Sequence, residues 1–395
     1  MSEGTDDKIK EYLEAINRNP NDDRAHNDLG NAYYSRGEYR KAIEQYKIAK
    51  ALKPDEAIYY SNIGDANRAL RNWDEAINHY NEALKINPRD DWSLNSLGII
   101  YYLKREYDKS IKYYNEAIGI NPSDVYYTNI GDSYRMKGDL DSAIPYYEEA
   151  IGLNAEYDSA YNALGVVYYF KGEYDKAIQY YTKAIQIKPT AVYYSNLGDV
   201  YRALEKWDEA IENYKKAVEL DPRDDISYNG LGNAYFSKRL YSKAIEQYEK
   251  AISINRNPIY FSNIGDANRR LKKWDRAIEY YQKAIDQAKE ADPNDTTYHK
   301  SLGLAYNDRG VEYYNKGEDD KAIADYKKAM GLNSGDPVIC HNLYLAYNAK
   351  GMYKEAEESL REAMDLDPEN QTIPRSLKAL NLRDHRGFSG VLPSH

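Results

Sequence analysis

Four stretches of the sequence are near-copies of one another. They begin at Ile58, Val125, Val192 and Ile259, and each continues Tyr-Tyr/Phe-Ser/Thr-Asn-Ile/Leu-Gly-Asp. Their starts are 67 residues apart each time. A fixed period of this length is typical of stacked modules that contact only their neighbours. We therefore expect the chain to fold as an array of repeats rather than around one central core.

A shorter period, half as long, lies within this repeat, and glycine marks it. Eight glycines recur at nearly equal intervals: Gly30, Gly64, Gly98, Gly131, Gly165, Gly198, Gly232 and Gly265. With each glycine as position i, tyrosine stands at i+16 and alanine at i+19. The second half of a unit places apolar residues at i, i+3, i+4 and i+7, which predicts an amphipathic helix. Each unit is thus predicted to be a helical hairpin whose small residues let the two helices approach closely.

These residues resemble the tetratricopeptide repeat family. In the first unit the resemblance rests on Leu29, Gly30, Tyr33, Gly37, Tyr39, Ala42, Tyr46, Ala49 and Pro54. Two further units follow the first eight in register, with Gly310 and Tyr344 in the glycine position. The resemblance implies an all-α fold, a right-handed superhelical α-solenoid of about ten helix-turn-helix repeats with a capping helix at each end.

The register divides the chain into four predicted parts. Residues 1–22 contain the N-terminal capping helix, 23–292 repeats one to eight, 293–370 repeats nine and ten, and 371–395 a C-terminal capping helix and flexible tail. The interval from Gly265 to Gly310 is longer than one unit. We therefore expect the second helix of repeat eight to run through Ala291, and an extended first helix of repeat nine to start near Thr296. Such a feature would form either a bend or a docking ledge.

The composition limits the compartment and the class of partner. The net charge is -10, so binding to nucleic acid is not expected. The apolar runs are too short for a membrane span, and the acidic N-terminus lacks the apolar region of a secretory signal. The lone Cys340 excludes an internal disulfide and is expected to be a buried, inert thiol. A reducing, cytoplasmic location fits these features.

No residue pattern indicates catalysis or a cofactor. No glycine-rich phosphate loop is present, because every glycine lies in the repeat register or at a helix end. The six histidines are scattered, and none forms an i, i+4 pair suited to a metal. We therefore predict no catalytic residue, no metal site and no cofactor, and do not expect an enzyme.

Polar and aromatic residues recur on the first helix of each repeat, which in the resembled family lines a concave peptide-binding groove. Even-numbered repeats carry an asparagine, an aspartate and an arginine at groove positions: Asn62, Asp65 and Arg68; Asn129, Asp132 and Arg135; Asn196, Asp199 and Arg202; Asn263, Asp266 and Arg269. Odd-numbered repeats have an aromatic residue at the arginine position: Tyr34, Tyr102, Tyr169 and Phe236. Their asparagines come one residue earlier, at Asn27, Asn95, Asn162 and Asn229.

Two interpretations of these residues stand side by side. In one, the asparagine amides bind the main chain of a peptide and the arginines bind its acidic side chains. In the other, aspartate and arginine form i,i+3 ion pairs within one helix, copied with the longer repeat. Family members that clamp the C-terminal carboxylate of chaperones resemble one another in basic residues at groove positions that hold Asn27, Ser61, Asn95 and Thr128 here. Binding of chaperone tails is therefore not favoured.

The predicted function is a protein-interaction scaffold or adaptor that binds a peptide segment in its groove. One alternative is a regulatory or substrate-selecting subunit of a separately encoded enzyme. Another is a self-assembling scaffold, in which the groove of one copy takes the terminal helix of a second copy.

Overall fold

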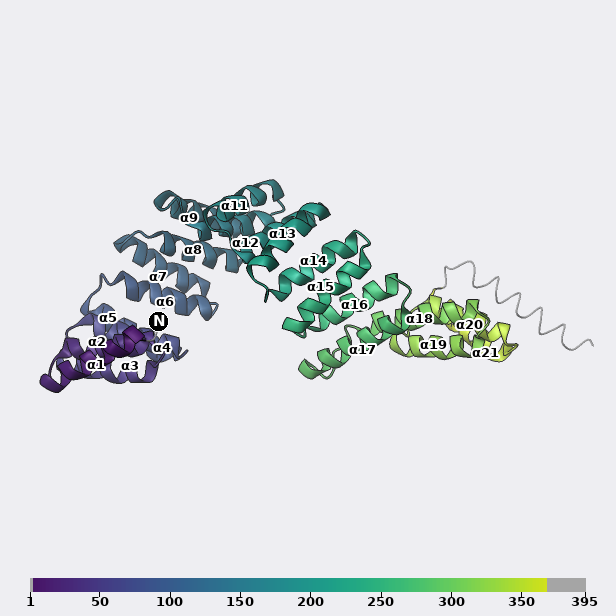
Figure 1. The fold of residues 1–395 in the computed structure, drawn as a ribbon, viewed down its shortest axis with the longest axis horizontal. Helices are drawn as coiled ribbons and strands as arrows, with labels where there is room; N and C mark the ends of the chain where they lie inside the picture. Colours follow the sequence, from purple (N-terminus) through teal and green to yellow (C-terminus); the bar gives the residue numbers. More distant parts are fainter. Residues whose placement is uncertain (1–2, 368–395) are drawn as a thin grey trace, which may run out of the picture. The chain divides into compact units, whose positions relative to one another are not determined.

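The computed structural model describes residues 3–367, which form 21 α-helices and no β-strand (Figure 1). The chain divides into two compact units, Met1–Pro189 and Thr190–His395. The first unit contains α1 (Glu3–Arg18), α2 (Asp23–Ser35), α3 (Tyr39–Leu52), α4 (Ala57–Ala69), α5 (Trp73–Ile86), α6 (Asp91–Leu103), α7 (Tyr107–Ile120), α8 (Asp124–Lys137), α9 (Leu140–Leu153), α10 (Asp158–Phe170) and α11 (Tyr174–Ile187). The second contains α12 (Ala191–Ala203), α13 (Trp207–Leu220), α14 (Asp225–Ser237), α15 (Tyr241–Ile254), α16 (Pro258–Arg270), α17 (Trp274–Ala291), α18 (His299–Asn315), α19 (Asp319–Leu332), α20 (Pro337–Ala349) and α21 (Tyr353–Leu366).

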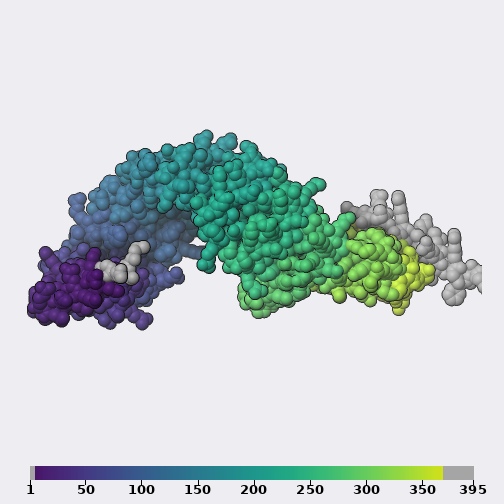
Figure 2. All heavy atoms as spheres, viewed as in Figure 1, coloured from purple at the N-terminus to yellow at the C-terminus, as the bar shows by residue number. Residues whose placement is uncertain are grey.

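From α2 onward, consecutive helices pair as hairpins, five in each unit, as the sequence predicted. Within each unit, the two helices of a hairpin pack closely against each other, and the second also packs on the first helix of the next hairpin. First helices of successive hairpins touch as well, for example α4 with α6 and α16 with α18. Side chains fill the spaces between the ribbons of neighbouring helices within each unit (Figure 2). This nearest-neighbour packing confirms the predicted α-solenoid fold class.

The repeat glycine lies against the ring of the tyrosine at i+16, in the second helix of the same hairpin. A Cβ atom at Gly131 would lie only 2.6 Å from Cε1 of Tyr147, and one at Gly98 only 2.5 Å from Cε1 of Tyr114. The two alanines of the second helix, Ala143 and Ala150, are fully buried. Glycine within a helix costs about 1 kcal/mol relative to alanine. It recurs here because the backbone and the buried ring are in direct contact.

The turn inside each hairpin contains one residue with a positive φ angle, at position i+7 from the repeat glycine. In the fourth repeat this residue is Gly138, with φ 89°, whereas the third repeat has Arg105, with φ 62°. The same position holds Gly37, Gly172, Gly317 and Gly351 in four repeats, and Arg71, Glu205, Arg239 and Lys272 in four others. Left-handed backbone costs a residue with a Cβ atom about 1–2 kcal/mol. Half of the hairpins therefore carry local strain in this turn.

Replacing Arg105 by glycine is expected to raise the free energy of unfolding by about 0.5–1 kcal/mol. The relief of the left-handed strain exceeds the extra entropy that glycine gives the unfolded chain. Urea unfolding followed by circular dichroism measures the difference. The reverse change, Gly138→Arg, should lower stability by a similar amount. A loss of stability in Arg105→Gly would show that the arginine side chain contributes more than the strain costs.

The lengthened helices predicted near repeats eight and nine are present. α17 has 18 residues and ends at Ala291, and α18 has 17, against 13 or 14 in the other repeat helices. α18 begins at His299 rather than near Thr296, because Thr297 and Tyr298 form a turn. In that turn the backbone N–H of Thr297 bonds to the Asp295 carboxylate at 2.7 Å, and the N–H of His299 bonds to the Thr296 carbonyl at 3.1 Å.

The predicted terminal segments have different outcomes. α1 is present at the N-terminal end, where Ile9 packs against Leu29 and Ala32 of α2. The C-terminal capping helix and tail predicted for residues 371–395 lie outside the described residues. Cys340 is buried, as expected, and burial raises the pKa of its thiol to about 11. Every helix in residues 3–367 is too short or too polar to cross a membrane.

Candidate peptide-binding groove

All sixteen groove residues predicted from the sequence lie on the first helices of the hairpins. In the first unit they lie on α2, α4, α6, α8 and α10, and in the second on α12, α14 and α16. Each of them is half-buried. Each side chain is therefore partly held by the protein and partly accessible to a ligand.

The aspartates and arginines of three even-numbered repeats form ion pairs within one helix. The pairs are Asp65–Arg68 at 3.2 Å, Asp132–Arg135 at 3.0 Å and Asp199–Arg202 at 3.2 Å. Burial lowers the pKa of Arg135, but Asp132 and Tyr147 together outweigh it, so that the pKa lies above its usual value. Ion pairs of the kind foreseen by the second interpretation are thus present in these three repeats.

The fourth arginine of this series turns away from its own aspartate. Nε of Arg269 donates to Oδ2 of Asp308 on α18 at 2.6 Å. Asp266 does not form the ion pair with this arginine that the other three aspartates form, and burial raises the pKa of its carboxyl above the ordinary value although Tyr281, Arg269 and Arg270 act to lower it. The last of the four repeated sets is therefore electrostatically different from the other three.

Each of these aspartates also accepts a hydrogen bond from the buried tyrosine of its own hairpin. The hydroxyl of Tyr147 donates to Asp132 at 2.8 Å, and that of Tyr281 donates to Asp266 at 2.6 Å. Tyr80–Asp65 and Tyr214–Asp199 repeat the contact at 2.6 Å and 2.7 Å. Because a buried hydroxyl without a partner is costly, the aspartate stabilises the hairpin. Sequence reasoning missed this role, although the constant i, i+15 spacing between aspartate and tyrosine was a signal for it.

The asparagines pair between neighbouring first helices. Nδ2 of Asn129 on α8 donates to Oδ1 of Asn95 on α6 at 3.0 Å. Asn62 bonds to Asn27 at 2.7 Å, and Asn263 to Asn229 at 2.8 Å. Asn95 is buried whereas Asn129 is half-buried, so the pair has an inner and an outer member. An amide has two N–H donors and a carbonyl acceptor, so Asn129 keeps one N–H and its carbonyl for other partners.

The aromatic residues of the odd-numbered repeats pack on the start of the second helix of the same hairpin. Tyr34 contacts Tyr39 edge to face with ring centroids 5.2 Å apart, and Phe236 contacts Tyr241 in the same way at 5.3 Å. Burial, followed by the charge of Asp65, raises the pKa of Tyr34. The aromatic residue of one repeat is therefore close to the acidic residue of the next.

A hollow of about 510 Å³ opens between α4 and α6. Asn62 and Asp65 line it, together with Ile58 and Trp92, whose side chains are 52% and 51% exposed. The indole N–H of Trp92 donates to Asp65 Oδ2 at 2.9 Å, which fixes one edge of the ring. The hollow therefore combines polar groups with two large apolar surfaces.

The apolar residues of this hollow were not among the groove residues predicted from the sequence. They lie at position i−6 from the repeat glycine position, and exposed apolar residues recur there at Val125, Val192, Ile226, Ile259 and Val338. An apolar residue at this position, on an otherwise polar helix face, was the sequence feature that could have predicted the hollow. In the second unit, the predicted residues Phe236, Asp266 and Arg269 line a separate hollow of about 470 Å³.

Helical hairpins of this length, each packed through a glycine–tyrosine contact and stacked on its neighbours within a unit, define a repeat scaffold. Family models described as TPR repeat or tetratricopeptide repeat match residues 11–44, 30–70, 55–123, 124–190, 198–238, 226–258, 261–294, 304–336 and 339–370. The chain belongs to the tetratricopeptide repeat family. Members of this family are generally protein-interaction scaffolds and are typically non-catalytic.

Several solved structures are similar to parts of the chain. YrrB, described as a TPR protein with an unusual peptide-binding site, is 26% identical over 50% of this chain and 97% of its own, with a TM-score of 0.39. MamA is 30% identical over 41% of this chain and 96% of its own, also with a TM-score of 0.39. A tetratricopeptide repeat protein from Parabacteroides merdae is 18% identical over 65% and 99%, with a TM-score of 0.49. A comparison with curated protein sequences gave no match.

Proposed function

We propose that this protein is an interaction scaffold that binds an extended peptide segment of a partner protein along the first helices of its hairpins. The observation that carries the proposal is the hollow between α4 and α6, where Ile58 and Trp92 expose half of their side chains beside Asn62. Fully burying a large apolar side chain gains about 1.5–3 kcal/mol, so covering the exposed half of each of these two gains roughly half as much. A hollow of about 510 Å³ also lies within the range of about 300–1,000 Å³ typical of ligand sites.

The polar groups of the groove suit the main chain of such a peptide. Asn62 and Asn129, the outer members of their pairs, each keep an acceptor and a donor after bonding to the inner partner. With helices about 10 Å apart, equivalent asparagines two repeats apart are separated by roughly 20 Å. This distance corresponds to about six residues of extended chain at about 3.3 Å each. The peptide would therefore meet an amide at regular intervals.

The remaining predicted groove residues have secondary roles in this proposal. The aspartates hold the tyrosine hydroxyls, and Asp65, Asp132 and Asp199 also hold the arginines, so they shape the groove rather than bind the ligand. The arginines, half-buried on the same face, supply positive charge for acidic side chains. The aromatic residues from Tyr34 to Phe236 supply apolar contact in the odd-numbered repeats.

Removing the two apolar side chains of the hollow is expected to weaken peptide binding by about tenfold or more. Peptides selected from a random phage-displayed library on the immobilised protein would be synthesised with a fluorophore. Their affinity for the wild type and for Ile58→Ser/Trp92→Ala would be measured by fluorescence polarisation. The two half-exposed side chains together account for about a tenfold change or more. Both side chains are half exposed, so the variant should keep its fold.

A matched control removes two exposed apolar residues from second helices. Ile86 on α5 and Leu153 on α9 are 37% and 52% exposed and lie outside the hollow. Ile86→Ser/Leu153→Ser should bind the selected peptides as the wild type does. Equal affinity of all three proteins for every selected peptide would rule out the hollow as the binding site.

A further inference from the structure

The turn from α16 to α17 is more basic than the equivalent turns of the other repeats that share its sequence. Repeat eight has Arg270, Lys272, Lys273 and Arg276 at four positions where repeat two has Ala69, Arg71, Asn72 and Glu75, and repeat six has Ala203, Glu205, Lys206 and Glu209. The four positions therefore sum to a charge of +4 in repeat eight, 0 in repeat two and -1 in repeat six. The flanking tryptophan is kept in all three, as Trp73, Trp207 and Trp274. Repeat four, the remaining near-copy, has Leu140 at the tryptophan position and Met136, Gly138, Asp139 and Ser142 at the four others, with a summed charge of -1.

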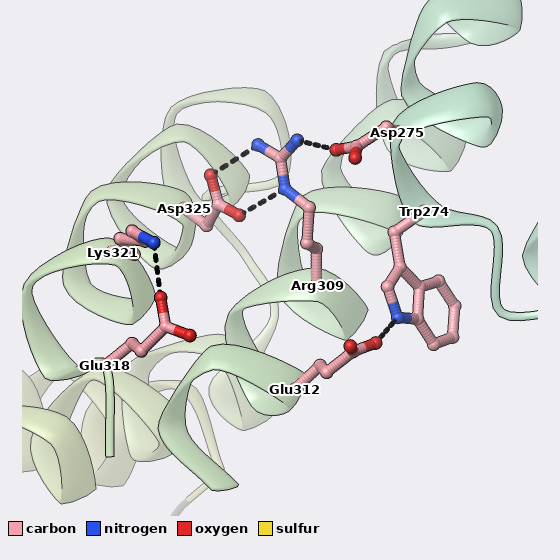
Figure 3. Close-up of polar contacts among 7 residues, drawn as sticks. All are labelled: Trp274, Asp275, Arg309, Glu312, Glu318, Lys321 and Asp325. Carbon is pink, nitrogen blue, oxygen red and sulfur yellow. Dashed lines mark hydrogen bonds and ion pairs between the residues drawn. The ribbon is translucent and has the colours of Figure 1, made fainter. Parts of the chain in front are cut away.

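These cations surround two adjoining hollows. Lys272, Lys273 and Arg276 line one of about 320 Å³, whose far wall is formed by α18. Arg270 and Lys272 line the other, of about 470 Å³. Trp274 belongs to both, and its indole N–H donates to Glu312 (Figure 3). The tryptophan ring is thereby held between the two hollows.

Three of the four acidic residues that line these hollows already have cationic partners from other positions, and the fourth is Asp266. Asp275 pairs with Arg309, Glu312 with Lys316, and Asp308 with Arg269. By contrast, the four cations of the turn are exposed and take part in no ion pair within residues 3–367. We define Arg270, Lys272, Lys273 and Arg276, together with Trp274, as the basic pocket. The residues that line the two hollows carry seven positive and four negative charges, a local surplus of three positive charges in a chain whose net charge is -10.

We propose that the basic pocket binds an acidic peptide segment of a partner protein, with carboxylates against the four cations and an apolar or aromatic side chain on Trp274. The inference rests on the proposed function, because it assumes that the chain binds peptides, but it concerns other residues. Charge complementarity selects the ligand, since the acidic remainder of the chain repels such a segment and the pocket attracts it. The indole ring adds the flat apolar surface that side chains pack against at interfaces.

The probe is a fluorescein-labelled heptapeptide in which a phenylalanine stands between two Asp-Glu-Asp triplets. Its affinity is measured by fluorescence polarisation at low and physiological salt. The test variant is Arg270→Ala/Lys272→Gly/Lys273→Asn/Arg276→Ala. Alanine and asparagine already occupy the equivalents of Arg270 and Lys273 in repeat two, and glycine relieves the positive φ of 57° at Lys272. Circular dichroism confirms that the variant is folded.

The matched control removes four exposed cations from the first unit: Arg40→Ala/Lys47→Ala/Arg71→Gly/Arg89→Ala. It lowers the net charge by the same amount and contains one glycine at a left-handed position. We expect the pocket variant to bind the heptapeptide about tenfold or more weakly than the wild type, and the control to bind it as the wild type does. Affinity should fall with salt for the wild type and much less for the pocket variant.

Three results would overturn the proposal. The first is no binding of the heptapeptide to the wild type at low salt, and the second is an equal loss in the pocket variant and the control. The third is binding of an oligothymidine of equal charge to the same pocket with equal affinity, which would indicate a general polyanion site. None of these results affects binding at Ile58 and Trp92, so this proposal and the proposed function can fail separately.

Discussion

Replacing Arg309 by methionine is expected to lower the free energy of unfolding of the second unit by about 3–5 kcal/mol. Arg309 of α18 holds both carboxylate oxygens of Asp325 on α19, at 2.6 Å and 2.8 Å (Figure 3). Asp325 is only 3% exposed. Without the guanidinium it would be a buried charge with no counter-charge, which the low dielectric of the interior penalises strongly.

The double variant Arg309→Met/Asp325→Leu distinguishes a lost ion pair from lost packing. Because it removes both charges, it should recover most of the stability that the single variant loses. Urea unfolding of the full chain, followed by circular dichroism, compares the three proteins. If the double variant were as unstable as Arg309→Met, the shape of the arginine side chain rather than the unpaired carboxylate would account for the loss.

The second large effect is expected at the repeat glycine. Gly131→Ala should lower the free energy of unfolding of the first unit by about 1–3 kcal/mol, the typical cost of overpacking a core. The new Cβ atom would lie 2.6 Å from the Tyr147 ring, which is fully buried and bonded through its hydroxyl to Asp132. The ring therefore cannot move aside without breaking that bond, and the helices must separate.

Two other helical glycines provide the control for this substitution. A Cβ atom at Gly119 on α7 or Gly152 on α9 meets no atom within 4 Å, and both residues are exposed. Gly119→Ala and Gly152→Ala should therefore raise stability by up to about 1 kcal/mol through helix propensity alone. Thermal unfolding of the three variants gives opposite signs if the glycine–tyrosine contact is the cause. Stabilisation by Gly131→Ala would contradict it.

The fold was predictable from the sequence because its determinants are local and repeated. The glycine, the two alanines and the tyrosine of a hairpin all lie between positions i and i+19, and the same types recur in successive copies. The longer helices of repeats eight and nine were also predictable, because the interval between Gly265 and Gly310 is longer than one repeat. Nearest-neighbour packing needs no long-range information, so one unit predicts the next.

The roles of the groove residues were less predictable, because they depend on contacts between repeats. The sequence predicted that the amide of Asn129 binds a peptide, but this amide donates to Asn95, which belongs to the preceding repeat. Arg269 and Arg135 occupy the same position in their repeats, so the sequence predicts the same contacts for both. Only Arg269 can reach a carboxylate in the following repeat. At position i−2 from its glycine, that repeat has Asp308, whereas the repeat after Arg135 has Ala163 there.

By itself, the sequence determined the number, length and register of the hairpins, since helix periodicity and the glycine–tyrosine spacing are properties of a single repeat. Only the tertiary structure decided which polar groups are used up inside the protein and which remain for a ligand. Asp132 binds a buried tyrosine, whereas Ile58 and Trp92 stay half exposed in a hollow. The physical reason is that hydrogen-bond satisfaction and exposure depend on the neighbouring helix, which a helical period does not specify.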